Sequence, residues 1–434
     1  MSWSVPDLMS IRLEFVAEAL GRRHPFAGLC TLYGISEKTG YKWLARFRAG
    51  GPAALADASH APACIPHRTP IAVREAIWAM RRHHPTWGAR KLRAALTASD
   101  PRIDWPAAST ITTVLHAAGL IAPRRRRART VPGAASPFLT ATVPNDLWTI
   151  DYKGQFTTGD GHYCYPLTIV DSASRFLLAC DAHRRISTAS VRRSLEACFR
   201  TYGRPAALLS DNGAPFASVH APRRFSALSA WWVQLGIRPL LTQPRHPEQN
   251  GRHERMHRTL KAEATKPPAR ALRAQQARFD AFRDEYNCLR PHEALGLTPP
   301  ARHYRPSERP WPTRLAPFQY PADYHVRRVA PGGVLNWHRR QIYVSTALAG
   351  HDLGLQPVSA VHYDVYFNEY LMGTLNVQAS AFTSLTQSRT SPIIPAAQQH
   401  LSASDPFLVD CVRLRNSSQP SAALCSPLRL RVSA

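Results

Sequence analysis

The chain has 434 residues, and its charge favours one class of partner. Lys and Arg number 55 against 29 Asp and Glu, which gives a formal net charge of +26 at pH 7. Such an excess indicates a polyanionic partner, most simply nucleic acid, although a basic protein without one is the alternative. The sequence has no run of about 18 apolar residues, so we expect no membrane span. The eight cysteines form no CxxC pair, which argues against a zinc site or a disulfide framework.

Residues 1–60 have the pattern of a helix-turn-helix domain. Residues 10–48 are helical by pattern, with a turn at Gly34, and Ser36 can cap the helix that follows. The apolar face of that helix carries Trp43, Leu44 and Phe47. Three polar residues near its start lie on other faces and are candidates for DNA contact: Lys38, Thr39 and Lys42. We expect 36–48 to be a recognition helix, with an ordinary helical hairpin as the alternative.

Residues 61–122 repeat this theme in three amphipathic segments. The first, IAVREAIWAMRRHH, ends at Pro85, and TWGARKLRAAL and ASTITTVLHAAGL follow it. Six apolar residues recur at helical spacing and should form a small core: Ile77, Met80, Leu92, Leu96, Ile111 and Leu115. We predict a second helix-turn-helix-like domain.

An arginine-rich linker is expected at 123–140. Its run of like charges is Arg124, Arg125, Arg126 and Arg127. Consecutive arginines repel one another and cannot pack into a core. We expect them to follow DNA phosphates, while a solvated tether without a binding role is the alternative.

The remaining chain divides into an α/β part, a β part and a tail. Residues 141–304 begin with three β-rich runs, with a hairpin signal at 159–161, and then alternate helices and strands. This order predicts an α/β domain with a mixed sheet. Residues 305–379 alternate apolar and polar positions, which fits a small β-barrel. Residues 380–434 are rich in Ser, Pro and Gln and are expected to be a disordered tail.

Three acidic residues of the α/β part stand out by their positions. Asp151 lies within the apolar strand of WTIDYKG, Asp211 ends ALLSD, and Glu254 lies on the helix of NGRHERMHRTLK. Two strand carboxylates and one helix carboxylate can converge at a sheet edge, where their charges would repel. Divalent metal ions would relieve that repulsion, and oxygen ligands suit Mg²⁺. An aspartate that only caps a turn is the alternative for each strand end.

The local sequences around these residues are specific. LWTIDYKGQF, LLSDNGAPF and HPEQNGRHERMHRTLKAE closely resemble the three active-site motifs of DDE recombinases. More narrowly, they look like bacterial insertion-sequence transposases with a retroviral-integrase-type (rve) catalytic core. NCLRPHEALGLTPPARHY resembles the segment after that core, so the resemblance covers about residues 10–375.

The resemblance implies an RNase H-like fold and a polynucleotidyl transferase. Asp151, Asp211 and Glu254 would be the catalytic, metal-binding triad for two Mg²⁺ ions, for which Mn²⁺ can substitute. The expected reaction is cleavage and strand transfer at terminal inverted repeats.

The resemblance also implies the partners. They are double-stranded DNA, as element ends and target, and further copies of the chain on that DNA. No membrane and no small-molecule substrate are expected, and the location would be the bacterial cytoplasm, nucleoid-associated when DNA is bound. A catalytically inactive, transposase-derived DNA-binding protein or repressor is the alternative, and a nuclease acting on RNA–DNA hybrids is a third possibility.

Several neighbours have candidate supporting roles. At about 100° per residue, Arg258 and Lys261 share the helix face of Glu254 and could hold phosphates. A salt bridge between Glu254 and Arg258 is the alternative for that arginine. Further candidates are Asn212 and His246 for orienting water or DNA, Asp171 as a fourth ligand or a turn cap, and Arg290 and His292 as structural residues.

The spacing of the motifs departs from the family in one place. Between Asp211 and Glu254 lie 42 residues, more than is usual in the family. We expect the extra residues to form a loop insertion in SVHAPRRFSALSAWW.

Overall fold

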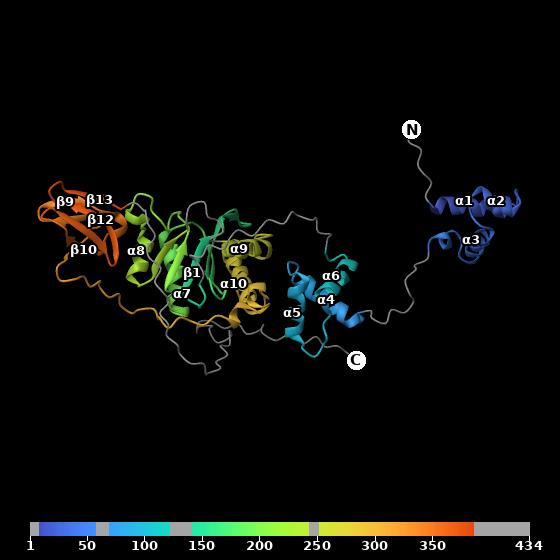
Figure 1. Ribbon diagram of the computed structural model, residues 1–434, viewed down its shortest axis with the longest axis horizontal. Coiled ribbons are helices and arrows are strands. Elements are labelled where there is room, and N and C mark those ends of the chain that lie inside the picture. The colour runs from blue at the N-terminus through green and yellow to red at the C-terminus, as the bar shows by residue number, and fades with distance from the viewer. Residues whose placement is uncertain (1–7, 58–68, 122–140, 243–250, 386–434) are drawn as a thin grey trace, which may run out of the picture. The chain divides into compact units, whose positions relative to one another are not determined.

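The computed structural model describes residues 8–57, 69–121, 141–242 and 251–385. The chain separates into two compact units, Met1–Thr69 and Pro70–Ala434 (Figure 1). Among the described helices, none has both the length and the apolar character that a membrane crossing requires. The five cysteines of the described ranges carry free thiols, and four of them are buried.

The first unit is a three-helix domain. Its helices are α1 (Leu8–Gly21), α2 (Phe26–Leu32) and α3 (Glu37–Gly50), followed by the 3₁₀ turn η1 (Pro52–Leu55). Ser36 caps α3, because its Oγ accepts a hydrogen bond from the Thr39 amide at 3.3 Å. Gly40 allows α3 to approach α2 closely, since a Cβ there would lie 2.7 Å from Cys30 Sγ. The predicted helix-turn-helix pattern and its cap are confirmed.

The second unit begins with another helical domain, formed by α4 (Ile71–His83), α5 (Ala89–Ser99) and α6 (Ala108–Ala117). Five of the six predicted core residues are buried, and Met80 packs against them partly exposed. Two tryptophans complete this core, Trp87 in the corner between α4 and α5 and Trp105 before α6. The predicted three-helix arrangement is therefore confirmed.

The central sheet has six strands: β1 (Leu147–Tyr152), β2 (Phe156–Thr157), β3 (Tyr163–Asp171), β4 (Leu177–His183), β5 (Ala207–Ser210) and β6 (Arg238–Leu241). Their order is β2-β3-β1-β5-β6, with β4 paired to β3. β1 runs antiparallel to β3 but parallel to β5, and β5 runs parallel to β6. The predicted mixed sheet is confirmed.

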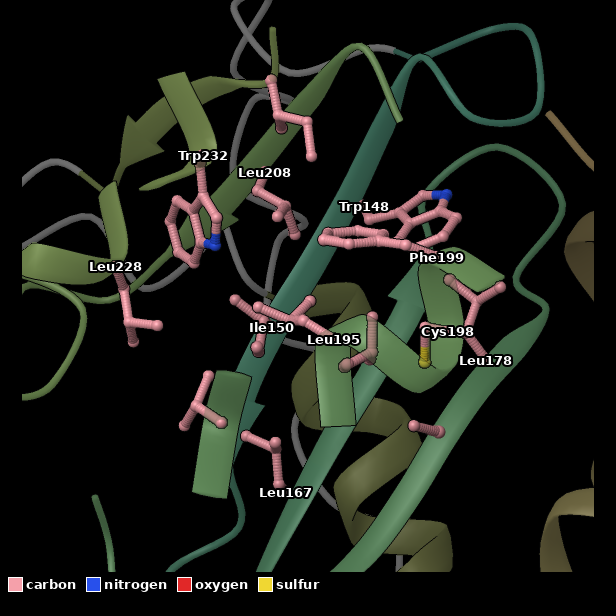
Figure 2. Packing of buried hydrophobic residues seen from close by; sticks show 14 of the residues in the cluster. Trp148, Ile150, Leu167, Leu178, Leu195, Cys198, Phe199, Leu208, Leu228 and Trp232 are labelled. Carbon is pink, nitrogen blue, oxygen red and sulfur yellow. The ribbon is translucent and has the colours of Figure 1, made fainter. Parts of the chain in front are cut away.

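Helices cover both faces of this sheet (Figure 1). α7 (Thr188–Tyr202) and α8 (Ala227–Gln234) pack on one face, where Trp148 stacks on Phe199 and Trp232 belongs to the same core (Figure 2). α9 (Gly251–Ala264) and α10 (Leu272–Cys288) pack on the other face. Alternate residues of β3 serve the two cores, as the two-residue period of a strand requires.

The C-terminal region is rich in strands. A five-stranded antiparallel sheet contains β7 (His325–Arg328), β10 (Asp352–Pro357), β11 (His362–Phe367), β12 (Tyr370–Asn376) and β13 (Ala381–Ser384). The hairpin of β8 (Val334–Trp337) and β9 (Arg340–Tyr343) contacts both edge strands, β7 and β13. Short 3₁₀ turns connect parts of the second unit: η3 (Pro222–Arg224), η5 (Glu293–Leu295), η6 (Pro300–Arg302) and η7 (Thr346–Leu348).

The structure changes two of the expectations, the end of the strand-rich region and the nature of the insertion. Strand pairing continues into β13, beyond residue 379, because Ala381 pairs with Asn376; residues 386–434 of the expected tail lie outside the described ranges. The expected insertion is also more than a loop. Arg223 donates through its amide to Leu385 O at 3.2 Å, and Phe225 enters the core of the C-terminal strands. The insertion therefore joins the α/β domain to the strand-rich region.

Candidate active site

The register of two parallel strands places Asp151 beside Asp211. Thr149 on β1 is paired with Leu209 on β5, and each aspartate follows its paired residue by two positions. Because side chains repeat their direction every two residues, Asp151 lies on the same face of β1 as Thr149. Asp211 follows the last residue of the neighbouring strand β5 directly, and its charge is close enough to raise the pKa of Asp151. Thr149 contacts His253 of α9, so this is the face that α9 covers.

Electrostatic coupling links Glu254 to these aspartates. Burial raises the pKa of Asp151 to about 7, and repulsion from Asp211 and Glu254 adds to the rise. Burial also raises the pKa of Asp211, while a hydrogen bond from the Gly213 amide at 3.1 Å opposes the rise. Asp151 therefore experiences the charges of both other carboxylates, although Glu254 itself is solvent-exposed.

Two buried histidines hold α9 against the sheet. The Nε2 atoms of His253 and His257 lie 2.6 and 2.7 Å from Thr168 Oγ1. The Thr168 hydroxyl donates to the Asp151 carbonyl at 3.1 Å, so its oxygen is left to accept from both rings. Burial lowers the pKa of His253 to about 3 and that of His257 to about 2, which keeps both rings neutral.

These histidines were not among the residues predicted for the site. Their i,i+4 spacing around Glu254 was the available signal, since it puts both rings on one helix face. They act as a brace between α9 and the strands β1 and β3, with Thr168 as the shared acceptor.

The donor atoms at this site suit a hard divalent cation. Among the described residues, Asp151, His253 and His257 form the group of three whose ligand atoms all lie within 4.8 Å of one another. However, His253 Nδ1 lies 2.9 Å from Thr149 Oγ1, and the Nε2 atoms of both rings are engaged with Thr168. The fourth ring nitrogen, His257 Nδ1, faces the Asp151 carboxylate, 3.8 Å from its Oδ2. His253 therefore serves as a brace, whereas His257 Nδ1 and the Asp151 carboxylate remain as donor atoms that face each other; carboxylate oxygens are the ligands that Mg²⁺ prefers. Of the three carboxylates predicted for the site, only Asp151 belongs to this group of described residues; Asp211 and Glu254 do not.

Asp171 has a structural role in the turn between β3 and β4. It is fully buried and lies opposite Trp148 in the β1–β3 pairing. Its carboxylate accepts hydrogen bonds from the Asn145 amide at 2.8 Å and from the Ser174 hydroxyl at 2.6 Å. These contacts favour the turn-cap interpretation over a fourth metal ligand.

Asn212 supports the loop that carries Asp211. Its Nδ2 donates to the Thr242 carbonyl at 2.6 Å, and its Oδ1 accepts from Arg224 Nη1 at 3.1 Å. Both ends of the amide are therefore bound to protein groups, which fixes the loop beside the end of β6. His246 and the arginines Arg124, Arg125, Arg126 and Arg127 lie outside the described residues.

The candidate DNA-contact residues that are described lie on two helices. Lys38 and Lys42 of α3 are exposed, whereas Thr39 is half-buried and takes part in the Ser36 cap. On α9, Arg258 and Lys261 are exposed one and two turns after Glu254. Each helix thus presents cations to solvent where a phosphate backbone could approach.

Family comparisons cover the helical domains and the sheet domain. Two models described as integrase core domain match residues 141–247 and 235–300. Models described as helix-turn-helix domain and homeodomain-like domain match residues 11–63 and 39–115.

Individual relatives agree with these matches. A 39.2 kDa protein of insertion element IS476 from Xanthomonas euvesicatoria is 30% identical over 246 residues, which cover 56% of this chain and 67% of that protein. A protein of insertion element IS407 from Burkholderia multivorans is 29% identical over 42% of this chain and 64% of its own length. The HTLV-2 integrase catalytic core domain, a solved structure with magnesium, aligns over 38% of this chain and 100% of its own, with 15% identity and a TM-score of 0.31. On the 30% identity and 67% coverage of the IS476 protein and on the two integrase core models, the chain belongs to the family of insertion-sequence transposases that carry an integrase core domain.

Proposed function

We propose that the chain binds the terminal inverted repeats of its element and catalyses metal-dependent DNA cleavage and strand transfer. The observation that supports the proposal is the parallel pairing of β1 with β5, whose ends carry Asp151 and Asp211, together with the repulsion that Asp211 and Glu254 exert on Asp151. The two aspartates have raised pKa values, and Asp151 experiences repulsion from both other carboxylates. Repulsion among neighbouring carboxylates is relieved when divalent cations bind them, which is why we propose a metal site here.

Asp151, Asp211 and Glu254 would hold two Mg²⁺ ions, or Mn²⁺, which supply Lewis acidity toward the phosphodiester and activate the attacking oxygen. The protein's own part is to keep those carboxylates in place. His253 and His257 hold α9 and thus Glu254, and the Gly213 amide orients Asp211. Arg258 and Lys261 would hold DNA phosphates beside the site.

The same site can serve both chemical steps, because each is an in-line attack on a phosphodiester. In the first step water attacks at the element end, the old P–O bond breaks, and a free 3′-hydroxyl is released. In the second step that hydroxyl attacks a target phosphodiester, forming one P–O bond and breaking another. Neither step requires a covalent bond between protein and DNA.

DNA recognition would be shared between the helical domains. Lys38, Thr39 and Lys42 of α3 are the proposed contacts in the first domain, with α3 as the recognition helix. The arginine-rich linker would add sequence-independent affinity for the backbone. Because two element ends must be joined in one event, we propose that a multimer acts on DNA.

A strand-transfer assay tests this proposal. A labelled duplex carrying the terminal repeat is incubated with target DNA and Mg²⁺, using the wild-type chain and Glu254→Gln, which keeps the shape of the side chain and removes its charge. We expect the wild type to join ends and the variant to bind them with at least about a hundredfold slower joining, the size of a loss of several kcal/mol.

The matched control is Glu196→Gln, which removes a carboxylate that pairs with Arg192 on the surface of α7 and should join ends normally. If wild type and Glu254→Gln both bind ends and neither joins them, the chain is a DNA-binding relic and the proposed function is wrong.

A further inference from the structure

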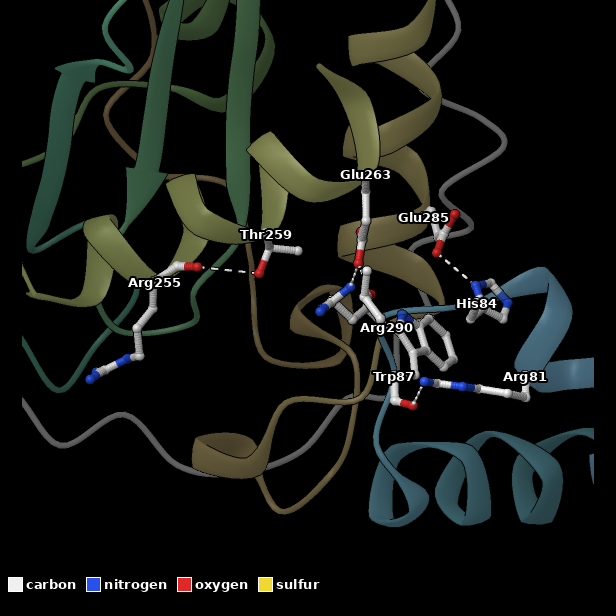
Figure 3. Close-up of polar contacts among 9 residues, drawn as sticks. Arg81, His84, Trp87, Arg255, Thr259, Glu263, Glu285 and Arg290 are labelled. Atoms are coloured by element: carbon white, nitrogen blue, oxygen red, sulfur yellow. Dashed lines mark hydrogen bonds and ion pairs between the residues drawn. The ribbon is translucent and has the colours of Figure 1, made fainter. Parts of the chain in front are cut away.

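The corner between α4 and α5 contacts the two helices that follow the sheet (Figure 3). His84 Nδ1 lies 2.9 Å from Glu285 Oε1 on α10, and the Thr86 hydroxyl donates to Glu263 on α9. The corner itself is held by Arg81, whose Nη1 donates to the Trp87 carbonyl at 2.7 Å. The second helical domain and the catalytic core thus meet through side chains of both.

A stack of buried groups continues this contact. The ring of His84 lies flat on that of Trp87, with centroids 3.8 Å apart and planes at 10°. The guanidinium of Arg290 lies 5.9 Å from the Trp87 ring centroid, and its Nη1 donates to Glu263 Oε1 at 2.5 Å. We name Glu285, His84, Trp87, Arg290 and Glu263 the docking cluster.

The side chains at the centre of the docking cluster are buried, so the two domains are packed together there. Trp87 is 1% exposed, Arg290 5% and His84 8%. Burial alone would raise the pKa of Glu285, but the hydrogen bond and charge of His84 and the charge of Arg290 lower it overall. The contact therefore combines a hydrogen bond from His84 to Glu285 and an ion pair of Arg290 with Glu263 with the stacking of His84 on Trp87.

The docking cluster bears directly on the helix of the active site. Glu263 follows Glu254 on α9 by nine residues, about 13 Å along the axis. His253 and His257 hold the first half of that helix on the sheet, and the docking cluster holds its last turn. A helix secured at both places keeps Glu254 at a constant distance from the two strand aspartates.

We propose that the second helical domain is a positioning module of the catalytic core, in addition to any contact with DNA. His84, Trp87 and Arg290 are its positioning residues, and they act on catalysis through α9 and Glu254. The catalytic part of this inference rests on the proposed function, whereas the docking itself does not. Loss of docking should slow strand transfer while end binding by the first domain persists.

Charge reversal in the full-length chain tests the inference without emptying the core. Glu285→Lys replaces the hydrogen-bond acceptor of His84 by a cation, and His84→Glu sets two carboxylates against each other. The double variant places a carboxylate at position 84 and an ammonium group at position 285, so the two charges attract each other. The matched control is Asp284→Lys, the adjacent residue on α10, which is 57% exposed and pairs with Arg283 within the core.

We expect each single variant to join ends about tenfold more slowly than wild type at saturating end DNA, with end affinity unchanged within about twofold. The double variant should recover to within about threefold of wild type, and the control should match wild type. Recovery in the double variant assigns the defect to this pair, and unchanged end affinity separates slower joining from a general loss of folded protein. If the double variant is no faster than the singles, or if binding and joining fall together, the positioning role is wrong.

Hydrogen exchange of peptides covering 84–92 and 283–293 provides a readout that does not depend on activity. We expect faster exchange in both singles and recovered protection in the double variant. Unchanged exchange in the singles overturns the docking itself. If the wild type binds ends and joins none, the proposed function fails, and exchange still decides whether the two domains dock as described.

Discussion

Replacing Asp151 by Asn should stabilise the catalytic core in the absence of divalent cations. Asp151 has its pKa raised from 3.8 to about 7, mainly by burial and then by Asp211. A carboxyl group with a raised pKa contributes stability below its unfolded pKa of about 4, and that contribution is lost as the pH rises through about 7. At pH 8 the folded wild type therefore holds an ionised carboxylate at a cost that the amide avoids.

The size of this stabilisation follows from the shift in the pKa of Asp151. About three pKa units correspond to roughly 4 kcal/mol as an upper bound. The Asp151 side chain is 20% exposed, so water offsets part of that cost. We expect Asp151→Asn to raise the free energy of unfolding by about 1–3 kcal/mol at pH 8 with chelator present.

Magnesium should make the wild type more stable than Asp151→Asn, the reverse of the order expected in chelator. A cation that binds only the folded state adds about 2.7 kcal/mol at a hundred times its Kd. The wild type should gain that stability and Asp151→Asn much less of it, because one ligand is missing. Urea unfolding with hydrogen exchange of peptides from β1 and β3 measures the effect in the core itself.

An exposed aspartate is the control. Asp323→Asn should change neither the stability in chelator nor the response to Mg²⁺, since Asp323 lies on the surface of the C-terminal region. The reasoning is refuted if Asp151→Asn is less stable than wild type at pH 8 in chelator, or if Mg²⁺ stabilises the two proteins equally.

Three further predictions concern the brace, the recognition helix and the docking region. His257→Ala should lower the free energy of unfolding by about 2–4 kcal/mol, because it leaves a cavity and removes a donor to Thr168. Urea titration measures this change, and His257→Gln should lower the free energy of unfolding by less. Lys42→Gln should weaken binding to the element ends and reduce the slope of log affinity against log salt concentration by about 1, as expected for the loss of one phosphate contact. Equal slopes for wild type and Lys42→Gln would exclude Lys42 as a phosphate contact. Lys91 has its pKa lowered to about 8 by burial and by Arg290, so its ionised form costs stability below pH 8 and stability should rise as the pH increases from about 8 toward 10. Urea midpoints of wild type and Lys91→Met should accordingly differ at pH 7, with the variant more stable, and converge as the pH approaches 10.5, the ordinary pKa of lysine.

Local features of this protein could be predicted from the sequence. Helical periodicity predicted α4, α5 and α6 and five of their buried residues, and Ser36 predicted the start of α3. These features depend on residues a few positions apart, whose interactions exist in any conformation that forms the element. The order of strands and helices likewise indicated a mixed sheet, and the motifs around Asp151, Asp211 and Glu254 identified the family.

Tertiary structure alone decided how those pieces meet. The pairing of β1 with β5 aligns aspartates that lie far apart in sequence, and Thr168 meets His253 across 85 residues. His84 meets Glu285 across 201 residues, and no spacing rule connects the two. The insertion before α8 looked like a loop because its partners are strands that follow it by more than a hundred residues. Such contacts form only when separate elements are packed together, since the burial that stabilises them depends on the whole fold rather than on neighbours in the chain.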